Sequence, residues 1–226
     1  MERFGHDAPD LRFGMELKDV TEIAKTVDFK VFRSVAENGG RVRGINVKNA
    51  ADQYSRKNID ELTTWTAEQF GAKGIVWFKV DAEGKLTGSS AKNFTEEALE
   101  AIGAKLEVEP NDLLLFSCGD FNLTCRVLNG LRRRIAAERK LYDPDEMNFC
   151  WVVKFPMFHW DEEENRWVAE HHPFTAPLPE DMAKLDGDPE AIGSIRAQAY
   201  DLVLNGFEAG GGTIRIHDPE IHNKVF

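Results

Sequence analysis

The side chains best suited to chemistry lie toward the end of the chain. Two carboxylates, Asp201 and Glu208, stand close in sequence to the guanidinium of Arg215, and two histidines, His171 and His172, precede them. A guanidinium donates two parallel hydrogen bonds and so suits a carboxylate. Paired carboxylates suit Mg²⁺, which prefers oxygen ligands. These residue types predict a charged surface that holds a zwitterionic ligand and a metal ion.

A β-hairpin is expected to position these residues. Residues 200–205 alternate apolar and polar side chains, which is typical of a strand with one apolar face. Three glycines follow at 210–212. If Gly211–Gly212 is a two-residue turn, Glu208 lies directly opposite Arg215, since glycine adopts the positive φ angles of such turns freely. The simpler alternative is a cross-strand ion pair beside a hairpin, with no ligand.

Asp201 and Glu208 can act together only if they lie on the same face of the predicted sheet. Asp201 and Glu208 are seven residues apart, so strict alternation places them on opposite faces of the sheet. A β-bulge inserts one extra residue and reverses that alternation. A bulge at Asn205–Gly206 would therefore bring both acids to one face.

Three stretches carry a resemblance to a known family. They are PDLRFGMEL (residues 9–17), HHPFT (171–175) and AYDLVLNGFEAGGGTIRIHD (199–218). Together they resemble bacterial-type aspartyl-tRNA synthetase, a class II enzyme, and the likeness covers essentially the whole chain. The resemblance implies an α+β fold. An antiparallel sheet of the class II type, here incomplete, is interrupted by an inserted α/β domain of mixed strands and helices, the GAD domain.

The same resemblance predicts a nested organisation of domains. Residues 1–28 and 123–226 belong to the catalytic domain, and residues 29–122 form the GAD insertion. At the start of the insertion we expect a strand at 29–32, paired with a second strand at 41–47 across a glycine-containing turn.

Other helices are predicted from capping residues and periodicity. Ser55 is a good N-cap for a helix over 56–70, and Thr95 for a shorter helix through Ile102. A long helix is expected over 123–140, and another is expected to run to about Gln198, just before the hairpin.

The resemblance also implies a reaction and the residues that serve it. ATP would activate L-aspartate to aspartyl-adenylate, which then passes to tRNA-Asp, or also to tRNA-Asn, with Mg²⁺ bound beside ATP. The attacking carboxylate comes from the substrate, so no catalytic nucleophile is expected. By position, Arg215 and His171 correspond to residues that bind L-aspartate. Glu208 corresponds to an ATP and Mg²⁺ ligand, Asp201 to a second metal-binding acid, and His172 to a supporting histidine.

Several parts of that family are missing from this sequence. It has no N-terminal anticodon-binding barrel, no dimer helix, and neither of the arginines that bind ATP. We therefore expect a central fragment of an aspartate–tRNA ligase that is a homodimer at full length, with the fragment inactive alone. The alternative is a non-catalytic, GAD-containing module that binds tRNA or a partner protein. One departure is Lys154, which stands where the family is usually acidic (WVVDFP).

Composition narrows the class of protein. The 226 residues carry a net charge of −11, which argues against a generally basic nucleic-acid surface. The Arg132–Arg134 cluster is the exception, and it would form either a solvated face or a contact with tRNA phosphates. No apolar run approaches the ~20 residues of a membrane-spanning helix. Cys118, Cys125 and Cys150 show no CxxC spacing, so we expect a cytoplasmic protein with free thiols.

Overall fold

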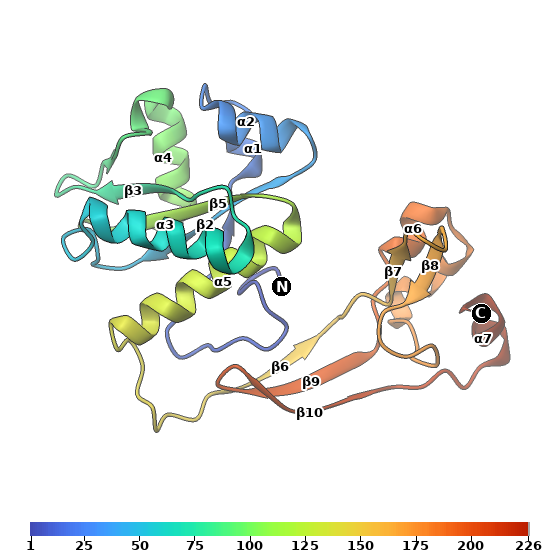
Figure 1. The fold of residues 1–226 in the computed structure, drawn as a ribbon. Helices are drawn as coiled ribbons and strands as arrows, with labels where there is room; N and C mark the ends of the chain where they lie inside the picture. Colours follow the sequence, from blue (N-terminus) through green and yellow to red (C-terminus); the bar gives the residue numbers. More distant parts are fainter. Residues whose placement is uncertain (226) are drawn as a thin grey trace. The chain divides into compact units, whose positions relative to one another are not determined.

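The computed structural model describes residues 1–225 and divides into two compact units, Met1–Glu146 (unit 1) and Met147–Phe226 (unit 2). The α+β class predicted from the sequence is confirmed, because each unit contains antiparallel strands together with helices (Figure 1). Among the described residues, no helix combines the length and the apolarity that crossing a bilayer requires. The nested organisation, with residues 29–122 as the insertion, stays a prediction.

Unit 1 is built on a five-stranded sheet in the order β1-β2-β5-β3-β4. Every neighbouring pair is antiparallel. The strands are β1 (Lys18–Asp19), β2 (Arg41–Val47), β3 (Val76–Val80), β4 (Leu86–Thr87) and β5 (Leu113–Gly119). The central strand, β5, begins with an unbroken apolar run, as expected for a strand that is covered on both faces.

Helices cover both faces of this sheet (Figure 1). One face carries α1 (Thr21–Ala24), α2 (Lys30–Glu37) and α4 (Glu96–Lys105), and the other carries α3 (Arg56–Phe70) and α5 (Phe121–Glu138). A 3₁₀ turn precedes α4.

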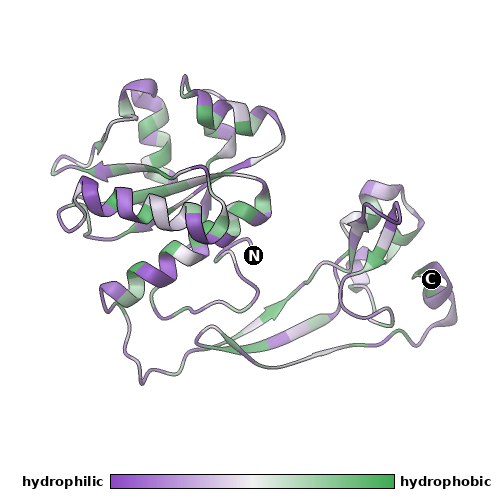
Figure 2. Cartoon of the chain, viewed as in Figure 1, coloured by the Kyte–Doolittle hydropathy of each residue, from purple (hydrophilic) through white to green (hydrophobic). Residues whose placement is uncertain are grey.

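Alternate residues of β5 belong to the two different hydrophobic cores of unit 1. Leu114 and Phe116 pack with α1, α2 and α4, whereas Leu113 and Leu115 pack with α3 and α5. Figure 2 shows the same division, with hydrophobic residues where the helices meet the sheet.

The expected strand at residues 29–32 is wrong. The helix α2 begins at Lys30, and its buried residues, Phe32 and Ala36, are one helical turn apart. A four-residue apolar run is too short to distinguish a helical period from a strand period, so packing decides. The strand β2 pairs instead with β1 and β5.

The capping residues are confirmed. The Ser55 side chain accepts the Asn58 N–H at 3.3 Å, and Thr95 accepts the Ala98 N–H at 3.2 Å. The helix α5 begins at Phe121, two residues before the predicted start, because Asp120 caps it.

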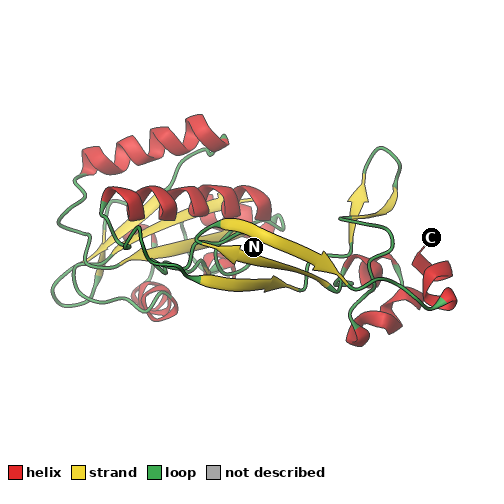
Figure 3. Cartoon of the chain, turned by 90° about the horizontal axis from the view of Figure 1, so that it is seen from below, coloured by secondary structure: helices red, strands yellow, loops and turns green. Residues whose placement is uncertain are grey.

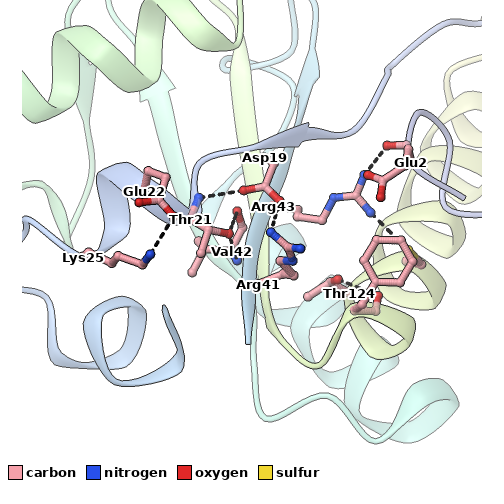
Figure 4. Close-up of polar contacts among 11 residues, drawn as sticks. Glu2, Asp19, Thr21, Glu22, Lys25, Arg41, Val42, Arg43 and Thr124 are labelled. Carbon is pink, nitrogen blue, oxygen red and sulfur yellow. Dashed lines mark hydrogen bonds and ion pairs between the residues drawn. The ribbon is translucent and has the colours of Figure 1, made fainter. Parts of the chain in front are cut away.

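The N-terminal residues are tied to the sheet of unit 1 by polar contacts (Figure 4). Arg43 of β2 is 1% exposed; its guanidinium donates to the Glu2 carbonyl and lies 3.1 Å from Cys125 Sγ. Asp19 accepts the Thr21 N–H at 2.8 Å at the start of α1. A buried guanidinium requires such partners, so the N-terminal segment is an integral layer of unit 1.

Unit 2 contains two small antiparallel sheets. The three-stranded sheet has the order β10-β9-β6, with β6 (Phe149–Val153), β9 (Ala199–Leu204) and β10 (Phe207–Thr213) side by side (Figure 3). The other is a hairpin of β7 (Phe158–Asp161) and β8 (Arg166–Ala169).

Only short helices occur in unit 2, namely η2 (Pro179–Asp186), a 3₁₀ helix, and α6 (Pro189–Gly193) and α7 (Pro219–Val225). The helix expected to run to Gln198 is wrong. Residues 196 and 197 instead form bridges with Pro156 and Pro177.

Candidate functional site

The hairpin that carries the candidate site turns at Asn205–Gly206. The pairing of β9 with β10 runs from Leu204↔Phe207 to Ala199↔Thr213. Asn205 and Gly206 have φ angles of 51° and 87°, as two-residue hairpin turns require. The Asn-Gly dipeptide was the signal in the sequence, and the expected turn at Gly211–Gly212 is wrong.

This register separates Glu208 from Arg215. Glu208 lies opposite Val203, and Arg215 bridges to Thr175. Neither side chain belongs to an ion pair within residues 1–225. The interpretation of the two residues as a cross-strand ion pair is therefore wrong, and both charges are available to a ligand.

A β-bulge brings the two acids together. The register shifts between Glu208 and Gly210, which places the extra residue at Ala209 instead of at Asn205–Gly206. Asp201 lies opposite Gly211. A Cβ on Gly211 would collide with Asp201 Oδ1 and would lie 3.2 Å from Glu208 Oε1. Both carboxylates therefore meet over the same glycine, on one face of the sheet.

The glycine triplet thus has a different role from a turn. Gly212 lies beneath the ring of Tyr200, whose Oη is 2.8 Å from the position of a Cβ, and Gly211 lies beneath Asp201. Glycine within a strand commonly marks such a close approach. The triplet lets side chains of β9 lean across β10 and leaves the surface beside the acids open.

Arg215 follows on the chain beyond β10. Backbone hydrogen bonds hold its neighbours, from the Ala176 N–H to the Ile214 carbonyl at 2.8 Å and from the Ile216 N–H to the Phe174 carbonyl at 2.9 Å. Gly211, Thr213 and Arg215 alternate along an extended chain, so Arg215 continues the face that bears the two acids. Its side chain is exposed.

The two histidines take different positions. The exposed His171 packs edge-on against Phe155, with ring centroids 5.1 Å apart. His172 Nδ1 accepts the Phe174 N–H at 3.1 Å, so its ring is fixed by the loop that precedes Thr175. Within residues 1–225, no hydrogen bond or ring contact joins His171 to Arg215 or to the acids, although the backbone bridge brings its loop to Arg215.

The acid pair fits one particular kind of metal ion. No group of three or more His, Cys, Asp or Glu side chains among the described residues is arranged to hold a metal. Mg²⁺, however, usually binds through one or two carboxylates and completes its shell with water and phosphate oxygens. Asp201 and Glu208 fit that pattern.

The Arg132–Arg134 cluster does not form one surface. Arg132 is fully buried, and its Nη2 donates to the carbonyls of Asp10 at 2.8 Å and Gly14 at 2.7 Å. Burial lowers the pKa of Arg132 to about 10. Arg134 pairs with Glu138 at 2.7 Å, and Arg133 is the exposed member of the three. Arg132 therefore belongs neither to a solvated face nor to a phosphate contact, the two roles predicted for the cluster. It anchors the N-terminal segment instead.

Comparison with known proteins identifies relatives of this chain. A family model described as GAD domain matches residues 32–128. The chain is 56% identical over 226 residues to the Aspartate--tRNA(Asp/Asn) ligase of Rhodopirellula baltica, covering 100% of this chain and 38% of that protein. The chain corresponds to a central segment of the bacterial aspartate–tRNA ligases. The resemblance drawn from the three sequence stretches is confirmed.

Two further relatives show the same coverage. The Aspartate--tRNA(Asp/Asn) ligase of Persephonella marina is 50% identical over 229 residues, 100% of this chain and 38% of the relative. The Aspartate--tRNA ligase of Agathobacter rectalis is 48% identical over 226 residues, 100% of this chain and 37% of the relative. The chain thus spans less than two fifths of the curated relatives it matches.

Proposed function

We propose that the face of β9 and β10 in unit 2 is part of a site that activates L-aspartate with ATP for transfer to tRNA. The observation that carries this proposal is the convergence of Asp201 and Glu208 over Gly211, without an ion-pair partner within residues 1–225. Two carboxylates held close together repel each other, and a bound cation relieves that repulsion. The similarity to aspartate–tRNA ligases supplies the substrate class.

Each residue of the site has a distinct task in this proposal. Arg215 binds the side-chain carboxylate of L-aspartate through its guanidinium fork, and His171 closes the aspartate site. Glu208 and Asp201 would hold Mg²⁺, which would supply positive charge to the ATP phosphates. His172 keeps the loop beside Arg215 in place through its bond to the Phe174 N–H.

The reaction requires positioning more than covalent chemistry from the protein. The α-carboxylate of the substrate is the nucleophile, and the protein holds it against the α-phosphorus while charge develops. The groups described here cover the aspartate side of that arrangement and part of the nucleotide side. We therefore expect the chain alone to show no aspartate-dependent pyrophosphate exchange.

The test places substitutions in a full-length aspartate–tRNA ligase that carries this segment. Arg215→Leu removes the partner of the substrate carboxylate, so aspartate-dependent pyrophosphate exchange should fall by at least ~10²-fold, the effect of losing one preorganised group. Arg166→Leu, an exposed arginine of β8, is the matched control and should leave exchange unchanged. A normal KM for aspartate in Arg215→Leu would exclude the proposed contact.

Specificity gives a second measurement at the same residue. Asparagine offers an NH₂ donor where aspartate offers an oxygen acceptor, and arginine has only donors. Arg215→Lys keeps the charge but loses the fork, so discrimination against asparagine should weaken. The ratio of kcat/KM for the two amino acids measures it. If this face takes no part in activation, none of these variants would change pyrophosphate exchange in the full-length ligase.

A further inference from the structure

A second charged surface lies entirely within unit 1 and has no role in amino-acid activation as proposed above. A pocket of about 530 Å³ opens at the helices α3 and α5. It is lined by His6, Trp65, Phe70, Arg126, Asn129, Gly130, Arg133 and Arg134. No acidic residue lines it, although the chain has a net charge of −11. A concentration of basic groups on an acidic protein points to an anionic ligand.

Gly130 allows aromatic rings to form part of the pocket. A Cβ at this position would lie 2.5 Å from Phe70 Cζ and 3.2 Å from Trp65 Cη2. The two rings of α3 therefore rest directly on the backbone of α5, with their planes 87° apart and their centroids 5.3 Å apart. The pocket thus offers apolar ring surface as well as positive charge.

Asn129 is a buried polar group that faces this pocket without a partner. It is 8% exposed, and its amide makes no hydrogen bond within the described part of the chain. Its amide atoms reach solvent at the pocket, where they can bond to a ligand. An amide presents one acceptor and two donors, which match the edge of a nucleobase.

Two guanidiniums flank this group along α5. Arg126 and Arg133 lie two helical turns apart, on the same helix face as Asn129 and Gly130. Both are exposed, and neither makes a hydrogen bond or ion pair with a residue that the structure describes. Arg134, in contrast, already pairs with Glu138 and lies over the Trp65 ring at 4.8 Å. Arg126 and Arg133 are therefore the phosphate-binding candidates.

His6 adds an imidazole from the N-terminal segment. Its Nδ1 accepts the Ala8 N–H at 2.8 Å and lies 3.1 Å from Asp7 Oδ1, so Nε2 is the ring nitrogen that remains for a ligand. The pocket therefore combines aromatic surface, an unpaired amide, free guanidiniums and an imidazole. Inorganic phosphate would leave the rings and the amide unused, and an apolar peptide would leave the guanidiniums unpaired.

We propose that this pocket binds a nucleotide. The base lies against the aromatic surface with its edge on Asn129, and the phosphate binds Arg126 and Arg133. The ligand is either a free mononucleotide or an unstacked nucleotide of an RNA, which share this chemistry. Arginine and aromatic side chains are the usual partners of such nucleotides.

Titration calorimetry on the full chain tests the proposal. The probes are the four 5′-ribonucleoside monophosphates, inorganic phosphate, and the matching nucleosides without phosphate. We expect at least one monophosphate to bind at least about tenfold more tightly than either of its parts, which corresponds to ~1.4 kcal/mol. Equal binding of phosphate and nucleotide would overturn the proposal, as would no nucleotide binding at all.

Variants locate the binding. Arg126→Gln/Arg133→Gln should weaken nucleotide binding by about tenfold or more, since two charge-assisted contacts are lost. Lys30→Gln/Lys140→Gln removes the same charge from exposed positions outside the pocket and should change nothing. Equal effects of the two double variants would show a nonspecific charge attraction and overturn the proposal.

Two further variants test the contact of the base with Asn129 and exclude binding at the proposed activation site of unit 2. Asn129→Leu should reduce the preference among the four monophosphates, and an unchanged preference would exclude the amide contact. Glu208→Gln in unit 2 should have no effect here. Loss of binding in Glu208→Gln but not in the arginine variant would assign the nucleotide to the activation site instead and overturn this inference alone.

RNA probes distinguish the two sources of the ligand. If an RNA hairpin with a single-stranded 3′ end binds and is displaced by the monophosphate, the natural ligand is a nucleotide of RNA. If only the monophosphate binds, it is a free nucleotide. RNA binding that no monophosphate displaces and that the arginine variant leaves intact would contradict the pocket as the site. Circular dichroism on every variant establishes that it is folded.

Discussion

The buried charges of unit 1 and the acid pair of unit 2 differ in the partners they have. In unit 1, buried charged side chains bind partners within the unit, as when Arg132 donates to two backbone carbonyls and Asp112 accepts bonds from Asn46 and from two backbone N–H groups. In unit 2, Asp201 and Glu208 converge and have no ion-pair partner in the described chain. The difference separates charges that hold the fold together from charges that are arranged for a ligand.

The two units also differ in how much of their apolar surface is buried. Unit 1 has a core on each face of its sheet. Unit 2 has one core of six buried residues, and β6 exposes Phe149, Trp151 and Val153 at 54%, 62% and 53%. This strand is coloured as hydrophobic in Figure 2. Unit 2 therefore buries less apolar surface than unit 1, and burial of apolar surface is the main driving force of folding.

Separating the units should have the largest effect. We expect residues 1–146 to unfold in one cooperative thermal transition, and residues 147–226 to show none, because a core of six residues, together with the buried Ala176 and Val203, cannot offset the entropy of ordering the chain. Calorimetry and circular dichroism measure this. A sharp transition in residues 147–226 would remove the contrast between the units.

A shorter fragment tests the predicted insertion boundaries. Residues 29–122 lack Val20, Ala24 and Val27 of one core and the α5 side chains of the other. We expect this fragment to lose cooperative unfolding, while residues 1–146 keep it. A cooperative transition in residues 29–122 would instead support the boundaries inferred from the sequence.

Substitution of Arg132, the buried arginine of unit 1, should have the next largest effect on stability. Arg132→Met removes the donor to the Asp10 and Gly14 carbonyls and leaves the Asp10 carbonyl unpaired in a buried place. We expect a loss of ~2–4 kcal/mol in the free energy of unfolding, measured with urea. Arg133→Met, one residue further on and exposed, is the control and should stay within ~0.5 kcal/mol. Equal effects would show that burial does not distinguish the two arginines.

Unit 2 also contains a buried acid that has its own partners, Asp181, which allows a direct test of the comparison. Asp181 is 2% exposed and accepts Arg196 Nε at 2.7 Å and Lys184 Nζ at 2.8 Å. Asp181→Asn weakens these bonds, so amide hydrogen exchange in unit 2 of the full chain should accelerate at least about tenfold. Asp186→Asn, which affects an exposed pair with Lys224, is the control.

The same acid should impose a pH dependence. Hydrogen bonds from Arg196 hold the pKa of Asp181 well below its usual range. A lowered folded-state pKa stabilises the fold above the unfolded pKa of ~3.9, and that stability is lost as the pH falls through the folded-state pKa. The protection of unit 2 should therefore decline below about pH 4 in the natural chain, and Asp181→Asn should lack this component. An identical decline in both would contradict it.

The smallest expected effect is at Lys154, which follows β6. Its φ angle is 62°, a left-handed conformation that asparagine and aspartate tolerate better than lysine. Lys154→Asn should stabilise unit 2 by ~0.5–1 kcal/mol, slowing amide exchange in β6 and β9 two- to fivefold. Lys154→Ala keeps the disfavoured conformation and should bring no gain. A gain in both variants would trace to the lysine charge instead.

The sequence by itself determined the features that depend on neighbouring residues. Ser55 and Thr95 cap helices through bonds to residues three positions on, so their types and spacing were sufficient. The apolar run that opens β5 required burial on both faces. The family resemblance likewise rested on contiguous stretches, and the residue types Asp201, Glu208 and Arg215 marked the candidate site.

Only the tertiary structure decided which of these residues meet. The bulge at Ala209, which the sequence placed near the turn, sets the face on which Glu208 lies. The burial of Arg132 depends on the N-terminal segment, more than a hundred residues away in sequence. Register and burial are set by the free energy of packing between distant segments. The local pattern of a strand or helix does not contain that information.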